Sequence, residues 1–212
     1  MNDEPSWSLA DPRPIAQGAR YTFFLPGRQE IEAIGVGDDV KLIFDYHHPT
    51  ETWGGERMWV TVTRVDGDML FGTLASVPDE PTSPLTPGQA IEFARFHVLA
   101  IDWGHPDTAP SSPVYREYWD RCLVDASVVD GEKPVEFLYR ETPDMAQDGD
   151  KFPDSGWRIR GRMDGATDEC NAPLYVALGA VLNQDDSWLH LIDAPVGSAF
   201  MRDFEADLYR QE

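Results

Sequence analysis

Short alternating runs of apolar and polar positions dominate the first half of the chain. Val40, Leu42 and Phe44 alternate with Lys41, Ile43 and Asp45, and residues 58–65 are rich in β-branched side chains. A period of two is typical of a strand with one buried face. The dipeptide Asp66-Gly67 follows at once and indicates a tight hairpin. We therefore predict strands over 40–44 and 58–65, with residues 69–74 as the returning strand.

Further short apolar runs extend this pattern on both sides, with turn residues between them. Pro and Gly separate the runs, and hardly any helical period is present. Several short strands with tight turns favour a small, strongly bent sheet or SH3-like barrel. The additional strands that we predict in this half cover residues 21–25, 89–93 and 97–103.

The second half mixes strand patterns with one helical period. Leu174, Leu178, Val181 and Leu182 fall at i, i+4, i+7 and i+8, and Pro173 suits a first helical turn. One main helix beside several strands predicts an α+β module. The strands expected here cover 121–129, 134–140, 156–160, 188–192 and a last one over 199–204 and 207–210, after a short helix at 115–120.

A segment rich in proline separates the two patterns. GHPDTAPSSP, residues 104–113, has three prolines and little apolar content, as linkers and surface loops do. The sequence therefore predicts a strand-rich α+β protein with two separate cores, in which a protease cleaves this segment first. The parts that we expect are an N-terminal arm (1–30), a mostly-β domain (31–108), a linker (109–118) and an α+β domain (119–212).

Charge narrows the classes of partner. The chain has 38 acidic and 17 basic residues, a net charge of -21, and both halves share the excess. Because phosphate contacts need Lys and Arg, we do not expect this chain to bind nucleic acid. A basic protein would be steered toward this surface, although the same charge also serves solubility alone. No stretch reaches the ~18 apolar residues of a membrane helix, and the first residues lack a secretory pattern, so we expect a cytoplasmic protein.

None of the candidate catalytic and metal-binding groups has the spacing that its chemistry requires. Adjacent histidines point apart, Ser198 is outside a nucleophile elbow, residues 161–165 lack the phosphate-loop lysine, and two cysteines make no disulfide framework. We therefore predict no catalytic residue, bound metal or cofactor. The groups considered were His47, His48, His97, Asp102, His105, Ser198, Cys122, Cys170 and, as a weak calcium set, Asp148, Asp150 and Asp154.

Aromatic residues divide into predicted core and predicted recognition groups. Trp59 and Trp157 lie in strand patterns and are expected in the cores, with Gly156 allowing a close turn beside Trp157. Aromatics that stand among acidic residues suit contact with a basic protein. The partner-binding residues that we predict are Trp53, Tyr115, Tyr118, Trp119, Asp144, Asp148, Asp150 and Asp154.

Two blocks resemble known bacterial families. GDDVKLIFDY with GERMWVTVTRVDGDMLFGTL (37–74) is similar to an uncharacterised domain family, over about residues 37–102. FLYRETP, DSGWRIR and DAPVGSAFMRD resemble the immunity-protein family numbered thirty-three in polymorphic-toxin systems, over about 121–209, with Ile159 replacing an aromatic residue and Met201 a charged one. In this motif pattern Pro195 and Gly197 have structural roles. The resemblance implies a non-enzymatic role, either blocking a cognate toxin or an uncharacterised housekeeping task.

Two hypotheses about function follow from these features. The first is a non-catalytic cytoplasmic binding protein, such as a toxin-immunity protein that engages a basic partner through acidic and aromatic groups. The second is an uncharacterised enzyme or accessory protein with a shallow polar site at the domain seam. A neighbouring toxin gene would favour the first hypothesis, and a deep pocket with convergent His and Asp would favour the second.

Overall fold

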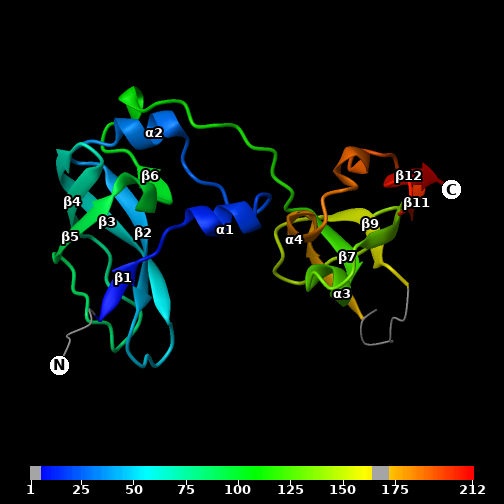
Figure 1. Ribbon diagram of the computed structural model, residues 1–212, viewed down its shortest axis with the longest axis horizontal. Coiled ribbons are helices and arrows are strands. Elements are labelled where there is room, and N and C mark those ends of the chain that lie inside the picture. The colour runs from blue at the N-terminus through cyan, green and yellow to red at the C-terminus, as the bar shows by residue number, and fades with distance from the viewer. Residues whose placement is uncertain (1–5, 164–171) are drawn as a thin grey trace. The chain divides into compact units, whose positions relative to one another are not determined.

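The computed structural model describes residues 6–163 and 172–212, and its contacts divide the chain into two compact units. The first unit contains the chain up to Gly18 and Phe23–Tyr115. The second contains Ala19–Thr22 and Arg116–Glu212, so a short N-terminal segment belongs to the C-terminal unit. Each unit is built around its own sheet (Figure 1). The protein is therefore strand-rich α+β, as the sequence predicts.

The first sheet is an antiparallel meander in the order β1-β2-β3-β4-β5, with β6 also paired to β2. The Asp66-Gly67 turn joins β3 to β4, and Gly67 adopts a φ of 59° there. A register shift between Val62 and Arg64 bends β3. Closure into an SH3-like barrel stays a prediction. The strands are β1 (Trp7–Leu9), β2 (Asp39–Tyr46), β3 (Gly55–Asp66), β4 (Met69–Leu74), β5 (Ala90–Ala94) and β6 (Ala100–Asp102).

One face of this sheet forms the first core, because every second side chain of β2, β3 and β4 points inward. Val40, Val60 and Leu70 are completely buried. Two short helices, α1 (Arg13–Gly18) and α2 (Arg28–Ala33), belong to the N-terminal part, and Ile34 at the end of α2 enters the core. The predicted arm of residues 1–30 thus contains β1, α1 and the start of α2, apart from its first five residues, which lie outside the described part.

The second sheet has the order β10-β7-β9-β8-β11-β12 and contains one parallel pair, β7 with β9. The remaining pairs are antiparallel. The described residues also form three 3-10 turns, at Arg95–His97, Pro106–Thr108 and Leu189–Leu191. The strands are β7 (Arg121–Asp125), β8 (Val135–Arg140), β9 (Asp154–Gly161), β10 (Pro173–Ala177), β11 (Ala199–Asp203) and β12 (Leu208–Gln211).

Two helices and one turn cover a single face of the second sheet. α3 (Ala126–Val129), α4 (Leu178–Gln184) and the turn at Leu189–Leu191 share a core with the inward side chains of β7, β8 and β9. Trp157 and Trp188 are completely buried in it, with ring centroids 5.8 Å apart. None of the helices in the described part of the chain has the length and hydropathy needed to span a bilayer.

Several predicted elements are wrong, and local hydrogen bonds explain them. Residues 174–177 form an edge strand on β7, so the helix begins at Leu178 and not at Pro173. Residues 188–192 close a 3-10 turn, in which the Leu191 amide donates to the carbonyl of Trp188 at 2.8 Å. The strand predicted over 121–129 ends at Asp125, where α3 begins. Residues 21–25 and 115–120 are irregular, and only Ala100–Asp102 of the predicted 97–103 strand pairs.

Candidate functional site on the second sheet

Three sequence motifs of the second unit meet at one arginine, Arg140 of YRETP. Its Nε donates to the carbonyl of Ser155 at 3.0 Å, and its Nη1 donates to the carbonyl of Ala194 at 2.8 Å. Its backbone amide donates to Ser198 at 2.9 Å and its carbonyl accepts the Gly197 amide at 2.7 Å. The guanidinium also lies 5.8 Å from the Trp157 ring centroid. These motifs therefore hold β8, β9 and the turn before β11 together.

The DSGW motif is the buried first half of β9, where the pairing with β7 has a bulge. Asp154 accepts the Gly156 amide at 3.0 Å, and the Ser155 hydroxyl donates to the carbonyl of Arg121 at 2.6 Å. Gly156 has a φ of 80°, which favours glycine. The Trp157 indole then enters the core and donates to the carbonyl of Ile192 at 3.2 Å. The predicted core position of Trp157 is confirmed by its complete burial.

The other face of the second sheet, called the open face here, carries the side chains that alternate with the core positions. It consists of Leu123, Phe137, Tyr139, Arg158, Arg160 and Met201. The register places Tyr139 beside Arg158, and Phe137 between Arg160 and Met201. In the described part of the second unit no helix packs on this face, and Met201 is 39% exposed. A sheet face with aromatic groups and no helix packed on it is a candidate protein-binding surface.

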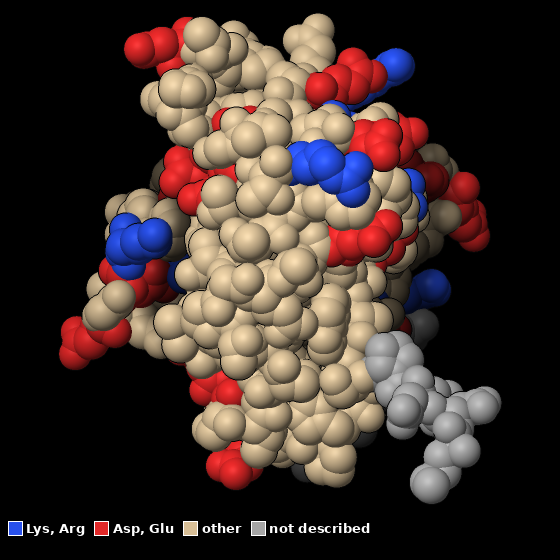
Figure 2. Space-filling model, turned by 90° about the vertical axis from the view of Figure 1, so that its left-hand side faces the viewer, with Lys and Arg blue, Asp and Glu red and all other residues tan. Residues whose placement is uncertain are grey.

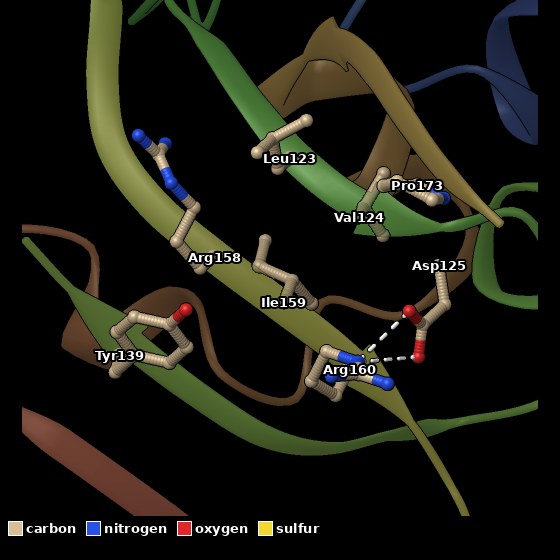
Figure 3. A pocket seen from close by; sticks show the side chains of 8 residues that line it. All are labelled: Leu123, Val124, Asp125, Tyr139, Arg158, Ile159, Arg160 and Pro173. Carbon is tan, nitrogen blue, oxygen red and sulfur yellow. Dashed lines mark hydrogen bonds and ion pairs between the residues drawn. The ribbon is translucent and has the colours of Figure 1, made fainter. Parts of the chain in front are cut away.

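A central hollow lies on the open face between β7, β9 and β8 (Figure 3). It has a volume of about 310 Å³, and Leu123, Tyr139 and Pro173 form its apolar walls. Arg160 turns its guanidinium toward Asp125, with Nε to carboxylate distances of 2.9 and 3.0 Å. Asp125 is itself buried and also accepts the Gly161 amide at 3.0 Å. This end of the hollow is thus a closed ion pair.

The Arg158 guanidinium lies at the other end of the hollow from Arg160 (Figure 3), and a group of carboxylates surrounds it. Its side chain is only 4% exposed, and it pairs with Asp154 at 2.9 Å, Glu141 at 2.5 Å and Asp144 at 3.1 Å. The hydrogen bonds that Arg158 donates to Asp154 and Glu141 raise its pKa further above the ordinary value, although burial opposes this. Arg158 therefore stays charged and collects three acidic side chains at the edge of the open face.

A second hollow on the open face, called the apolar hollow, adjoins Tyr139. Phe137, Tyr139, Val196 and Ala199 line it, Glu141 stands at its rim, and its volume is about 480 Å³. The Phe137 and Tyr139 rings lie 5.7 Å apart and form one wall. Gly197, with a φ of 91°, turns the chain before β11 and leaves Val196 52% exposed. Pro195 closes that turn, because its carbonyl accepts the Ser198 amide at 3.1 Å.

The four aspartates predicted for recognition have different environments. Asp154 is 7% exposed and ion-paired, so the prediction that it lies on a recognition surface is wrong. Asp150 is largely covered, since Arg121 pairs with it at 2.5 Å and its side chain is 11% exposed. Asp144 and Asp148 are exposed. The structure thus joins Asp144 to the Arg158 group, and its role in binding stays a prediction.

The predicted aromatic recognition residues are distributed over both units. Trp53 belongs to the first unit and is 54% exposed, and Tyr115 of the same unit stacks on Phe24 at 4.7 Å. Tyr118 and Trp119 belong to the second unit and are half-buried against Tyr21 and Phe152. Of these four, Trp53 presents the most accessible ring. Partner binding by any of them stays a prediction.

Trp59 is not a core residue, contrary to the prediction. Met58 and Val60 are buried in the first core, so the intervening side chain must point to the other face of β3. There the ammonium of Lys41 lies 4.4 Å from the Trp59 ring centroid.

The left-hand side of the molecule in Figure 1, where β4 and β5 lie, has few charged side chains in its middle, as Figure 2 shows.

The candidate catalytic groups have structural partners. His47 meets the Ser8 hydroxyl at 2.8 Å, and His48 meets the carbonyl of Thr82 at 3.0 Å. Burial raises the pKa of the Cys122 thiol well above its usual range, so this thiol is not a reactive thiolate. Among the described residues no group of three or more His, Cys, Asp or Glu could hold a metal ion. Cys170, Asp164 and Gly165 lie outside the described residues.

Sequence reasoning missed the residues that give the open face its chemistry, namely Phe137, Tyr139, Glu141 and Arg158. A signal for them was present, because Arg158 and Arg160 alternate with Trp157 and Ile159 along DSGWRIR. Once Trp157 is placed in the core, both arginines must lie on the opposite face. Phe137 and Tyr139 flank Leu138 in the same way.

Comparison with known proteins found one family and supports the second block of motifs. No curated protein and no solved structure matched the chain. The resemblance suggested for residues 37–102 received no support from the family comparison. Residues 122–212, which make up most of the second unit, match the model of the Immunity protein Imm33 domain.

Proposed function

We propose that the protein is a non-catalytic immunity protein that binds a toxin protein and blocks its action. The observation that carries this proposal is the match of residues 122–212 to an immunity-protein domain. The open face of the same unit supports it, because protein-binding surfaces combine aromatic side chains with accessible apolar area. The description of that family favours a non-enzymatic role.

The partner in this proposal is a basic protein in the cytoplasm. A net charge of -21 gives long-range attraction for a cationic protein and repels nucleic acid. Exposed carboxylates at the edge of the open face, Glu141 and Asp144, provide short-range contacts for the same partner. Fractionation of the native host tests the location, and recovery outside the cytoplasm would contradict it.

The deciding experiment is neutralisation of a toxin encoded beside the gene. The toxin is expressed in a sensitive host with the wild-type protein, with Val196→Arg or with Val77→Arg. Both variants place a positive charge at an exposed valine, Val196 beside the open face at 52% and Val77 in the first unit at 75% exposure. Because a positive charge on the binding surface repels a basic partner, we expect growth with the wild type and Val77→Arg, and loss of rescue with Val196→Arg.

Unfolding curves of both variants show whether loss of rescue reflects lost folding. Death of cells that contain the wild-type protein would contradict the immunity role for that toxin. Rescue by Val196→Arg together with failure of Val77→Arg would move the binding surface to the first unit. Complex formation is checked by co-purification of the two expressed proteins.

A further inference from the structure

The apolar hollow has walls that suit the stem of a long side chain. Phe137 and Tyr139 are half-buried and present their ring surfaces beside Val196 and Ala199. Its volume of about 480 Å³ is within the range of pockets that accept small ligands. The methylene stem of a lysine or arginine buries well on such a surface while its charged end stays near water. Aromatic faces also attract cations directly.

The rim of this hollow has more negative charge than its own arginine requires. The charge of Arg158 is balanced by Asp154, which accepts two of its hydrogen bonds at 3.0 and 2.9 Å. Glu141 at the rim and Asp144, which is bound to the same arginine, add two further carboxylates, whose side chains are 44% and 73% exposed. Among the described residues no donor meets Oε2 of Glu141. The rim therefore offers an acceptor to a cation that comes from outside.

Arg160, at the other end of the open face, is less suited to bind an anionic group. Arg160 faces a buried carboxylate, Asp125, and the pair is electrically balanced. An anionic ligand there would compete with the Asp125 carboxylate for the Nε of Arg160. Glu141 and Asp144 also pair with a cation, Arg158, but Asp154 already balances its charge, so this group keeps an excess of negative charge. Charge complementarity thus favours a cationic group, and it favours the apolar hollow as the place where that group binds.

We propose that the apolar hollow is the pocket for one lysine or arginine side chain of the toxin partner. The stem of that side chain lies on Phe137 and Tyr139, and its charged end contacts Glu141 and Asp144. Buried anchors of this kind contribute much of the binding free energy of protein interfaces. The proposal rests on the proposed immunity function and specifies its partner chemistry.

Chemical-shift mapping with small probes tests the pocket without the toxin. The ¹⁵N-labelled full chain is titrated with N-acetyl-lysine methylamide, N-acetyl-arginine methylamide, their neutral analogue N-acetyl-norleucine methylamide and N-acetyl-glutamate methylamide. We expect saturable shifts at residues 137–141 and 196–199 for the two cationic probes. Norleucine should bind more weakly at the same place, because it has the stem without the charge.

Two variants separate the role of the rim from a general charge effect. Glu141→Gln with Asp144→Asn should weaken binding of the cationic probes at least about fivefold, the loss expected for exposed ion pairs of about 1 kcal/mol. Glu132→Gln, an exposed acid elsewhere in the second unit, should change it less than about twofold. The spectrum of each variant shows directly whether it is folded.

Three results would overturn the pocket. Equal affinity of the norleucine and lysine probes would show that the pocket does not recognise positive charge. Preferential binding of the glutamate probe would show that it prefers an anion. The absence of saturable shifts would show that the hollow binds none of these side chains. Toxin neutralisation keeps the two proposals distinct. If the rim variant still neutralises as well as the wild type, the pocket is wrong while the immunity role stands.

Discussion

Gly156 is a residue where an added methyl group meets backbone. A Cβ there would lie 2.2 Å from the carbonyl oxygen of Glu141, whereas one at Gly197 would meet nothing within 4 Å. Both glycines have positive φ, so either change to alanine costs about 1–2 kcal/mol of backbone strain. Only Gly156→Ala adds the clash. We expect it to lower the free energy of unfolding by at least about 2 kcal/mol more than Gly197→Ala, measured in urea. Equal losses would contradict this geometry.

Asp154 makes the stability of the second unit depend on pH. Burial alone would raise its pKa, but hydrogen bonds from Arg158 and from the Gly156 and Met145 amides outweigh burial and lower it to about 2. Because the folded pKa lies below the unfolded value, the contribution is complete above about pH 5 and is lost as pH falls toward about 2. We expect the unfolding free energy of Asp154→Asn to fall less steeply over that range than that of the wild type.

The matched control for this pH profile is Asp144→Asn. Asp144 pairs with the same arginine but its side chain is 73% exposed, so solvent screens the interaction. Its profile should follow that of the wild type at all pH values. A profile of Asp154→Asn parallel to the wild type would show that the Asp154–Arg158 pair does not link protonation to folding.

Single residues could be predicted from the sequence where a local pattern fixed their direction. Trp157 follows a glycine in a strand and is buried, as predicted. Trp59 stands between two core positions, Met58 and Val60, and the alternation that it belongs to places it outside. Asp154 was wrongly predicted to be exposed, because the sequence does not show that Arg158, four residues later in β9, forms an ion pair with it.

At the scale of elements, the segment Ala19–Thr22 binds the end of α4. The Asn183 side chain accepts the Tyr21 amide at 2.9 Å and donates to the Thr22 hydroxyl at 2.7 Å. Asn183→Ala removes both bonds and should cost about 1–2 kcal/mol of unfolding free energy. Gln184→Ala, at the exposed neighbouring position, should cost less than about 0.5 kcal/mol. Thermal and urea unfolding measure both variants, and equal effects would exclude the docking role of Asn183.

Elements with an alternating pattern and a local turn were predictable, and elements that depend on distant partners were not. β2, β3 and β4 follow from alternation and from Asp66-Gly67 alone. Leu174 of β10 has helical spacing to Leu178 and Leu182, but pairing with β7 makes its own segment a strand. The parallel pairing of β7 with β9 joins segments that no local signal connects. The alternation along each strand therefore predicts which residues lie on the open face, but not which strands lie next to one another in it.

At the scale of the molecule, two hydrogen bonds hold the connection between the units against the first unit. The Gly104 amide donates to Asp38 at 3.0 Å, and the Ser112 hydroxyl donates to Glu30 at 2.7 Å. Val114 is 98% exposed. The expectation that a protease cuts residues 104–113 first stays a prediction, and residues 104–108 and 111–115 are all exposed.

A single cut in this accessible part should leave the two fragments associated. A recognition site for a specific protease, inserted after Val114, allows one cut under native conditions. The N-terminal fragment then still carries Ala19–Thr22, which belongs to the second unit and is held by Asn183 and by the bond from Tyr21 Oη to Asp186 of 2.7 Å. We expect the cut chain to elute as one species in size-exclusion chromatography, and the same chain with Asn183→Ala to separate on dilution. Immediate separation of the two wild-type fragments would show that Ala19–Thr22 does not hold the second unit. If the two fragments of the Asn183→Ala chain stay associated on dilution, other contacts hold them together.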